Sequence, residues 1–279
     1  MRKALTLLGT GLAAALALTA CGGGESTPSA ETSLDPAQPV TVTVGASPVP
    51  QAKILEFIDQ NLAKEAGIDL TIEEFDDYQT PNIALSDGSL DANYYQHLPF
   101  LEEQEQSKGY KFEHGAGVHI EPYAGFSARH KDIADIPDGG TIAITNDPAN
   151  QPRALKVLEA AGLLKNIEDD SSVLNLTDEQ NPKKLKFEEN QPEILLPLVE
   201  DPKIDLALIN GNFILQAGLS TEEALVVESV EDNPYANFLV WREGEGTPAI
   251  AKLDELLHSP EVKEYITKTW PNGDVTPAF

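Results

Sequence analysis

The sequence predicts an α/β fold, because short β-branched runs alternate with amphipathic helical patterns over most of the chain. The clearest strand is residues 40–44, which alternates valine with threonine. In the next segment Ile54, Ile58 and Leu62 recur with a helical period, and the pattern stops at Gly67. The connections between such units are mostly short. This favours helices packed on both faces of a largely parallel sheet.

The same patterns place the remaining elements. Further strands are expected at residues 70–75, 90–95, 141–145, 185–188, 204–209, 224–227 and 236–241. Further helices are expected at residues 82–86, 99–107, 148–161 and 193–199, in a segment ending near 218, and at 248–258 and 260–270. Asp147 is followed by a proline, which makes it a favourable N-cap for one of these helices. The run 204–209 is almost wholly apolar, as in strands buried on both faces.

The N-terminal segment has the layout of a secretory signal. Arg2 and Lys3 precede an apolar run that ends at Ala20, directly before Cys21, the only cysteine of the chain. The sequence Leu-Thr-Ala-Cys at 18–21 resembles the bacterial lipobox, in which the thiol receives a diacylglycerol and the cysteine becomes the new N-terminus. We therefore expect a lipoprotein signal peptide at 1–20 and lipidation of Cys21. An ordinary signal peptide or a retained transmembrane helix is the alternative.

The next segment and the overall charge fit a body held outside the cell. Residues 21–39 are rich in Gly, Ser, Thr, Pro and acidic side chains, a composition typical of a flexible tether. The chain carries 19 Lys and Arg against 46 Asp and Glu, a net charge of −27. Such an acidic protein is not expected to bind nucleic acid. With a single cysteine there is no intramolecular disulfide, so the fold depends on its core.

Polar residues follow several predicted strands at the point where each strand ends. In α/β sheets ligands bind beyond the carboxyl ends of the strands. These polar runs are therefore the candidate site. They are residues 45–48, 76–81, 93–97, 146–150 and 210–212.

No catalytic motif is present in the sequence. It contains no G-x-S-x-G, no H-E-x-x-H and no glycine-rich phosphate loop. The five histidines do not form a ligand pattern, and His114, His119 and His258 are interpreted as surface or structural residues. We therefore expect no enzyme activity, no cofactor and no metal site. An anchored surface hydrolase and an adhesin are the alternatives from other classes.

Several motifs in order resemble the methionine-binding lipoprotein (NlpA) family, the substrate-binding components of methionine ABC importers. The resemblance runs from about residue 40 to the C-terminus. It rests on Phe-Asp-Asp-Tyr at 75–78, Leu-Asp-Ala-Asn at 90–93, Asn-Asp-Pro at 146–148, Asn-Pro-Lys-Lys-Leu at 181–185 and Pro-Tyr at 234–235.

This resemblance implies a two-lobed periplasmic-binding-protein-like fold with two crossovers and a ligand cleft between the lobes. One lobe would comprise residues 40–123 plus 228–279, and the other residues 124–227. The protein would be a lipid-anchored monomer on the extracytoplasmic face of the cell membrane. It would capture L-methionine and deliver it to an ABC permease with its ATPase subunits. A methionine-containing dipeptide or another amino acid is the alternative ligand.

The resemblance also implies which residues bind the ligand. Arg153 would hold the carboxylate, since a guanidinium matches a carboxylate in a bidentate pair and the start of a helix favours an anion. The amides of Asn210 and Asn237 would bind the ammonium and carboxylate of the zwitterion. Aromatic edges make favourable contacts with a thioether sulfur. The expected side-chain pocket and its flanking polar groups comprise Tyr78, Tyr95, His97, Asn150 and Gln96.

Two features depart from the family pattern. Glu121 lies directly before the first crossover and could alter the pocket, and Gln151-Pro152 replaces small residues before the arginine. Proline is tolerated there only in the first turn of a helix. We expect the substitution Arg153→Ala to abolish ligand binding while the fold is retained.

Overall fold

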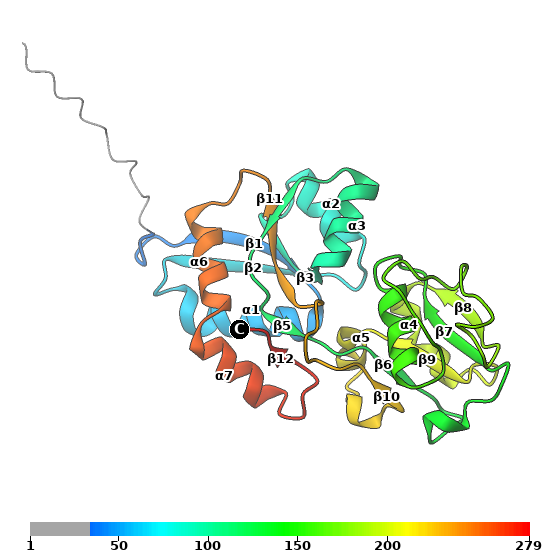
Figure 1. Ribbon diagram of the computed structural model, residues 1–279. Coiled ribbons are helices and arrows are strands. Elements are labelled where there is room, and N and C mark those ends of the chain that lie inside the picture. The colour runs from blue at the N-terminus through cyan, green and yellow to red at the C-terminus, as the bar shows by residue number, and fades with distance from the viewer. Residues whose placement is uncertain (1–33) are drawn as a thin grey trace, which may run out of the picture. The chain divides into compact units, whose positions relative to one another are not determined.

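The computed structural model describes residues 34–279, which form one compact unit. The predicted signal peptide, Cys21 and most of the predicted tether lie outside these residues. None of the helices between residues 34 and 279 has both the length and the apolar character needed to cross a membrane. The unit contains two mixed sheets, each covered by helices (Figure 1).

The first sheet has seven strands. Its order is β12-β5-β11-β3-β1-β2, and β4 pairs with β11. The strands are β1 Val40–Ala46, β2 Ile68–Glu74, β3 Ala92–His97, β4 Phe112–His114, β5 His119–Ile120, β11 Asn237–Arg242 and β12 Thr276–Pro277. The strand β1 pairs in parallel with β2 and β3, whereas β11 runs antiparallel to β3, β4 and β5.

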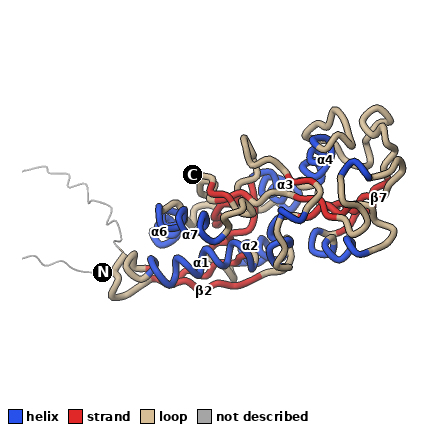
Figure 2. The backbone as a smooth tube through the Cα atoms, turned by 90° about the horizontal axis from the view of Figure 1, so that it is seen from below, coloured by secondary structure: helices blue, strands red, loops and turns tan. Residues whose placement is uncertain are grey.

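Helices cover both faces of the first sheet. They are α1 Lys53–Ile58, α2 Thr80–Asp87, α3 Leu98–Lys108, α6 Pro248–Leu257 and α7 Pro260–Thr269. Short π-helical segments, Pro48–Ala52 and Asp59–Ala63, adjoin α1 at its two ends. The helices α1, α6 and α7 contact one another on one face (Figure 2). The other face is covered by α2 and α3.

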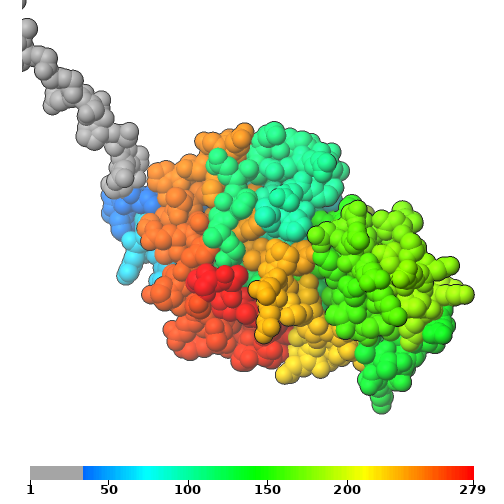
Figure 3. Space-filling model, viewed as in Figure 1, coloured from blue at the N-terminus to red at the C-terminus, as the bar shows by residue number. Residues whose placement is uncertain are grey.

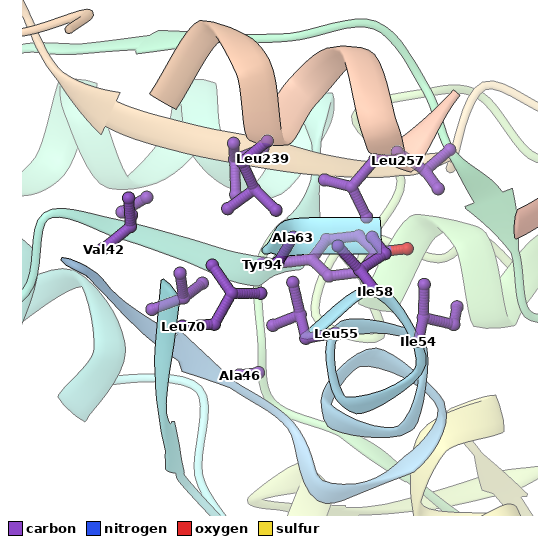
Figure 4. Packing of buried hydrophobic residues seen from close by; sticks show 14 of the residues in the cluster. Val42, Ala46, Ile54, Leu55, Ile58, Ala63, Leu70, Tyr94, Leu239 and Leu257 are labelled. Atoms are coloured by element: carbon purple, nitrogen blue, oxygen red, sulfur yellow. The ribbon is translucent and has the colours of Figure 1, made fainter. Parts of the chain in front are cut away.

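The main core of this region confirms the helical period seen in the sequence. Ile54, Leu55 and Ile58 of α1 are fully buried. They face Tyr94 of β3 and apolar side chains of β11 and α6 (Figure 4). Burying a side chain of this kind contributes roughly 1.5–3 kcal/mol. The amphipathic pattern therefore fixes α1 on the sheet.

The second sheet has five strands in the order β10-β6-β9-β7-β8. They are β6 Ala124–Phe126, β7 Thr141–Thr145, β8 Lys186–Asn190, β9 Leu206–Ile209 and β10 Val226–Val227. One face packs against α4 (Gln151–Ala160), and the other packs against α5 (Gly211–Gln216) and two short 3-10 helices, Pro192–Ile194 and Leu196–Glu200. Two further 3-10 turns are Ile133–Asp135 and Thr221–Glu223.

The chain crosses between the sheets twice. It leaves the first sheet after β5 and enters the second at β6, and it returns between β10 and β11. We call each sheet with its helices a lobe. The C-terminal helices thus cover the same lobe as the first strands of the body, as the colours of Figure 3 show. The exact lobe boundaries remain a prediction.

Three sequence-based expectations are wrong in detail. The sheets are not largely parallel, because the parallel strands (β3, β1 and β2 in the first sheet, β9, β7 and β8 in the second) form one edge of each sheet and the remaining strands are antiparallel. The helix expected at 193–199 is two 3-10 helices, since Pro197 cannot donate the backbone hydrogen bond that would continue the first. Asp147 does not cap α4, which begins at Gln151. Its carboxylate instead accepts from the backbone of Ala149 and Asn150 in the preceding turn.

Ordered packing begins before the first strand. Leu34 packs against the main core, and Asp35 forms an isolated β-bridge with Gln38. Gly67, with a φ of 75°, lies directly against this turn, and a Cβ there would be 2.9 Å from the side chain of Leu34. Contacts with the body therefore extend into the end of the segment expected to be a tether.

Candidate functional site

One pocket collects side chains from both lobes. It contains about 360 Å³ of space between its lining atoms, which includes space open to solvent. All eight residues expected to bind a ligand line this pocket. Their roles toward a ligand remain a prediction. The lining residues are Tyr78, Tyr95, Gln96, His97, Phe100, Glu121, Asn150, Arg153, Asn210, Gly211, Asn212 and Asn237.

The first lobe supplies an aromatic wall. Tyr78 follows β2, Tyr95 and His97 lie in β3, and Phe100 lies in the first turn of α3. The rings of Tyr78, Tyr95 and Phe100 lie 5.9–6.1 Å apart between centroids, at tilted or perpendicular angles. Such arrangements are favourable for aromatic groups. The Tyr95 hydroxyl donates to the backbone oxygen of Tyr78, which fixes the loop after β2 on the wall.

His97 is held as a neutral imidazole between the lobes. Its Nδ1 accepts from the backbone N–H of Phe100, so its proton is assigned to Nε2, which lies 3.0 Å from Oδ1 of Asn150 in the other lobe. Burial, together with the nearby charge of Arg153, lowers the pKa of His97 to about 3. His97 therefore stays neutral at physiological pH.

Two of the expected site residues are mainly braces. The amide of Gln96 exchanges hydrogen bonds with Asn82 and also donates to Asn93, all within a buried cluster. The amide of Asn150 donates to Asp147 and accepts from His97 and Asn210. Most of their hydrogen-bonding capacity is therefore used within the protein.

Arg153 lies at the centre of the pocket and is only 4% exposed. It occupies the first turn of α4, and not the second as the predicted helix start implied. Its Nε and Nη2 form a bidentate pair with Glu228 at 2.8 and 2.6 Å, and Nη2 also donates to the backbone oxygen of Glu121. Burial opposes the charge, but the Glu228 carboxylate outweighs it, and the pKa of Arg153 is raised.

This ion pair changes the expectation for Arg153→Ala. Removing one partner of a buried pair leaves the other charge uncompensated, which costs about 3–5 kcal/mol. The substitution should therefore destabilise the fold as well as affect a ligand. The pair joins α4 to the second crossover, a contact that sequence reasoning did not anticipate.

Some polar atoms of the lining residues have no partner among residues 34–279. Oδ1 of Asn210 is buried and accepts no hydrogen bond. Within the same residues, Nη1 of Arg153 makes no hydrogen bond, and Asn237 uses only its Oδ1, which accepts from Gln51. Buried polar groups are rarely left unsatisfied in proteins. The pocket thus presents donors and an acceptor to a bound molecule.

Four lining residues were not expected to take part. Phe100 was visible only as part of the motif at 99–101, and Gly211 and Asn212 only as part of the polar run after β9. The Tyr78 hydroxyl donates to Oδ1 of Asn212 across the lobes. Glu121 was noted only as a departure from the family pattern. No group of three His, Cys, Asp or Glu side chains within the described part of the chain could hold a metal ion.

Comparison with known families decides the class of the chain. A family model described as NlpA lipoprotein matches residues 42–279. The chain belongs to the NlpA lipoprotein family. The resemblance found in the motifs is therefore confirmed.

Similar proteins support this assignment. The methionine-binding lipoprotein MetQ of Bacillus subtilis is 40% identical over 85% of this chain and 87% of its own length. A nutrient-binding protein from Burkholderia cenocepacia, solved bound to methionine, is 34% identical, with a TM-score of 0.79 over 85% of this chain and all of that one. A periplasmic substrate-binding protein of an ABC transporter from Coxiella burnetii is 36% identical, with a TM-score of 0.78 over the same shares.

These comparisons confirm the predicted fold class. This chain is a mixed α/β protein with two sheets, and its fold is similar to those of periplasmic-binding-protein-like structures. The names of these relatives describe lipoproteins and binding proteins of transport systems, and none of the three names an enzyme.

Proposed function

We propose that this protein captures L-methionine in the pocket between its lobes and delivers it to an ABC permease and its ATPase subunits. We further propose that it acts outside the cytoplasmic membrane, as a monomer anchored through a lipid on Cys21. One observation supports the choice of ligand: the same pocket has unsatisfied polar atoms on one side and an aromatic wall on the other. A zwitterion with a thioether side chain matches both sides.

The polar side would bind the α-amino acid group. Nη1 of Arg153 and Nδ2 of Asn237 are donors for the carboxylate, and Oδ1 of Asn210 is an acceptor for the ammonium. The α4 N-terminus places its positive dipole end at the same side. The names and bound ligand of the similar proteins favour methionine as the amino acid.

The aromatic wall would bind the side chain. Tyr78, Tyr95 and Phe100 present ring edges and faces, with which a thioether sulfur makes contacts of about 0.3–1.5 kcal/mol. We propose binding without turnover. Both nitrogens of His97 are engaged within the protein, and its low pKa keeps it from accepting a proton.

Ligand binding is tested by thermal unfolding of the purified protein, refolded to remove any bound molecule. Each amino acid, D-methionine and several methionine dipeptides are added in turn. A ligand at a hundred times its Kd adds about 2.7 kcal/mol of stability. An increase of the unfolding temperature with L-methionine supports the proposal. A larger increase with a dipeptide or another amino acid would show that this compound, and not L-methionine, is the ligand. If none of these compounds raises the unfolding temperature, the ligand proposal is contradicted, and the adhesin and hydrolase alternatives must be considered again.

The anchoring proposal has its own test. Cells expressing the wild-type protein or the Cys21→Ser variant are separated into membrane and soluble fractions. We expect the wild-type protein in the membrane fraction and the variant outside it. Equal membrane association of the two would contradict lipidation of Cys21.

A further inference from the structure

Glu121 is a buried carboxylate in the pocket, and no Lys or Arg side chain of residues 34–279 contacts it; its ionisable partner is His119, at 2.7 Å. It is 6% exposed and lines the pocket beside Arg153. The only other charged lining residue is Arg153, whose charge is matched by Glu228. Arg153 contacts Glu121 only through the backbone oxygen. A buried charge without a counter-charge is costly, so the pocket favours a cationic group at this point.

Only one of the two carboxylate oxygens of Glu121 takes part in hydrogen bonds within the described residues. Oε1 of Glu121 accepts from Nε2 of Gln51 at 2.6 Å and lies 2.7 Å from Nε2 of His119. Among the hydrogen bonds of residues 34–279, none involves Oε2. A carboxylate can accept several hydrogen bonds, so Oε2 is available to a donor in the pocket.

A buried chain of groups holds this orientation. The Tyr94 hydroxyl contacts Nδ1 of His119, and both side chains are fully buried. With the hydroxyl donating to Nδ1, Nε2 of His119 carries a proton and donates to Oε1 of Glu121. This contact holds Oε1 in place, and Oε2 is left for the ligand.

The backbone that follows Asn210, the residue with the unsatisfied acceptor, passes close to Glu121. A Cβ on Gly211 would be 2.6 Å from Cβ of Glu121, so the backbone that carries Asn210 approaches Glu121 closely. Oδ1 of Asn210 is the buried acceptor without a partner. Two acceptors on this side and the Arg153 guanidinium beside them have the charge pattern of an α-amino acid.

Building on the proposed function, we propose that Glu121 is a specificity-determining residue that binds the α-ammonium of the ligand. The pocket then selects free amino acids, or peptides that place a free ammonium at Glu121, over analogues without one. The aromatic wall selects the side chain, and Glu121 selects the primary amine. A carboxylic acid without the ammonium would leave Glu121 buried and unpaired.

The test measures the Kd of L-methionine and of 4-(methylthio)butanoate, its deaminated analogue, by calorimetry on the full-length protein in detergent. Three proteins are compared: wild type, Glu121→Gln and Glu103→Gln. The amide introduced by Glu121→Gln retains an acceptor for Gln51 and His119 but turns a donor toward the ammonium. Glu103 lies at the outer cleft beside Asp147, outside the ligand pocket, and controls for the loss of one negative charge.

We expect the wild-type protein to bind methionine at least about 100-fold more tightly than the analogue. Glu121→Gln should weaken methionine binding about 10- to 100-fold, the range for a hydrogen bond to a charged group, and leave the analogue within about threefold. Glu103→Gln should leave both Kd values within about threefold. Methionine binding unchanged in Glu121→Gln, or equal binding of both ligands to the wild type, would overturn the assignment.

The wild-type comparison needs no substitution, so equal binding of the two ligands overturns the assignment even if Glu121→Gln fails to fold. The outcomes also separate this inference from the proposed function. If another free amino acid binds in place of methionine and depends on Glu121, the proposed ligand is wrong and the role of Glu121 stands. If neither a free amino acid nor a peptide with a free ammonium binds, both are overturned.

Discussion

The two sides of the pocket are built from different chemistry. The first lobe contributes all the aromatic side chains, and it also contributes the polar residues Gln96, Glu121 and Asn237. The second lobe contributes no aromatic side chain, and its polar groups come from the starts of α4 and α5. A polar group placed at a helix start gains from the free N–H groups and the dipole there. The aromatic side chains gain from packing on a sheet buried on both faces. The contrast indicates that the aromatic wall, which comes from the first lobe alone, and the polar groups, which come from both lobes, recognise different parts of one ligand.

Substitutions on the two sides of the pocket can test this division of roles. Changes on the second lobe should alter affinity for every amino acid alike, since the zwitterion is common to them. Changes on the aromatic wall should alter the preference among side chains.

Arg153→Gln should have the largest effect on both stability and binding. It leaves Glu228 buried without its partner, so the free energy of unfolding should fall by about 3–5 kcal/mol, measured by urea unfolding. Methionine binding should weaken by more than about 100-fold because a charge-assisted contact is lost. The double variant Arg153→Gln with Glu228→Gln should regain much of the stability but not the binding. Normal methionine binding by the double variant would exclude Arg153 from the ligand site.

His97 should make stability depend on pH at the contact between the lobes. Its pKa is about 3 in the folded protein and about 6.5 when unfolded, so below pH 6.5 the unfolded state binds a proton that the folded state does not. The free energy of unfolding should therefore fall as pH decreases, by about 2 kcal/mol from this group between pH 6.5 and 5. In the His97→Gln variant, the decrease in the free energy of unfolding over the same pH range should be smaller by this amount. Parallel pH profiles of the two proteins would refute the neutral, buried state of His97.

Gly211→Ala should disturb Glu121 through steric contact. The new Cβ would lie 2.6 Å from Cβ of Glu121 and 3.2 Å from the backbone oxygen of Pro122. Overpacking of this kind costs about 1–3 kcal/mol, and methionine affinity should fall roughly 10-fold. Gly140→Ala is the matched control, because its Cβ would be 3.0 Å from a backbone oxygen away from the pocket. If both variants lose equal affinity, the effect is not local to Glu121.

Phe100→Leu should have the smallest effect and should change selectivity. The ring contacts Tyr78, Tyr95 and His97 on the wall. Its loss removes a sulfur–aromatic contact of about 0.3–1.5 kcal/mol, so the preference for methionine over norleucine should fall by up to about 10-fold. Competition calorimetry measures this ratio. An unchanged ratio, with both affinities reduced, would assign Phe100 to packing alone.

Local patterns predicted the long elements of the fold and missed the short ones. The strand at β7 and the terminal helices α6 and α7 were found nearly to their ends, because alternation and helical period extend over many residues. The strands β5 and β12 have two residues each and show no period. Their pairing depends on partners far away in sequence, which no local window contains.

The candidate site was predicted from motifs and not from periodicity. Motif resemblance named eight residues, and the structure places all of them around one pocket. It could not reveal the pair of Arg153 with Glu228, which are 75 residues apart, or the chain from Tyr94 through His119 to Glu121. Such contacts form only when segments far apart in the sequence pack together, so the local sequence around each residue does not predict them.

The position of β11 in the first sheet has a consequence for the order of folding. This strand, Asn237–Arg242, lies between β5 and β3, whereas all strands of the second sheet come from residues 124–227. During synthesis from the N-terminus, the second sheet is therefore complete before β11 leaves the ribosome. Until then the edge of β3 that pairs with β11 is open, and an open strand edge favours pairing with other chains. The middle of the chain thus completes its fold first, and the lobe that begins the protein closes last.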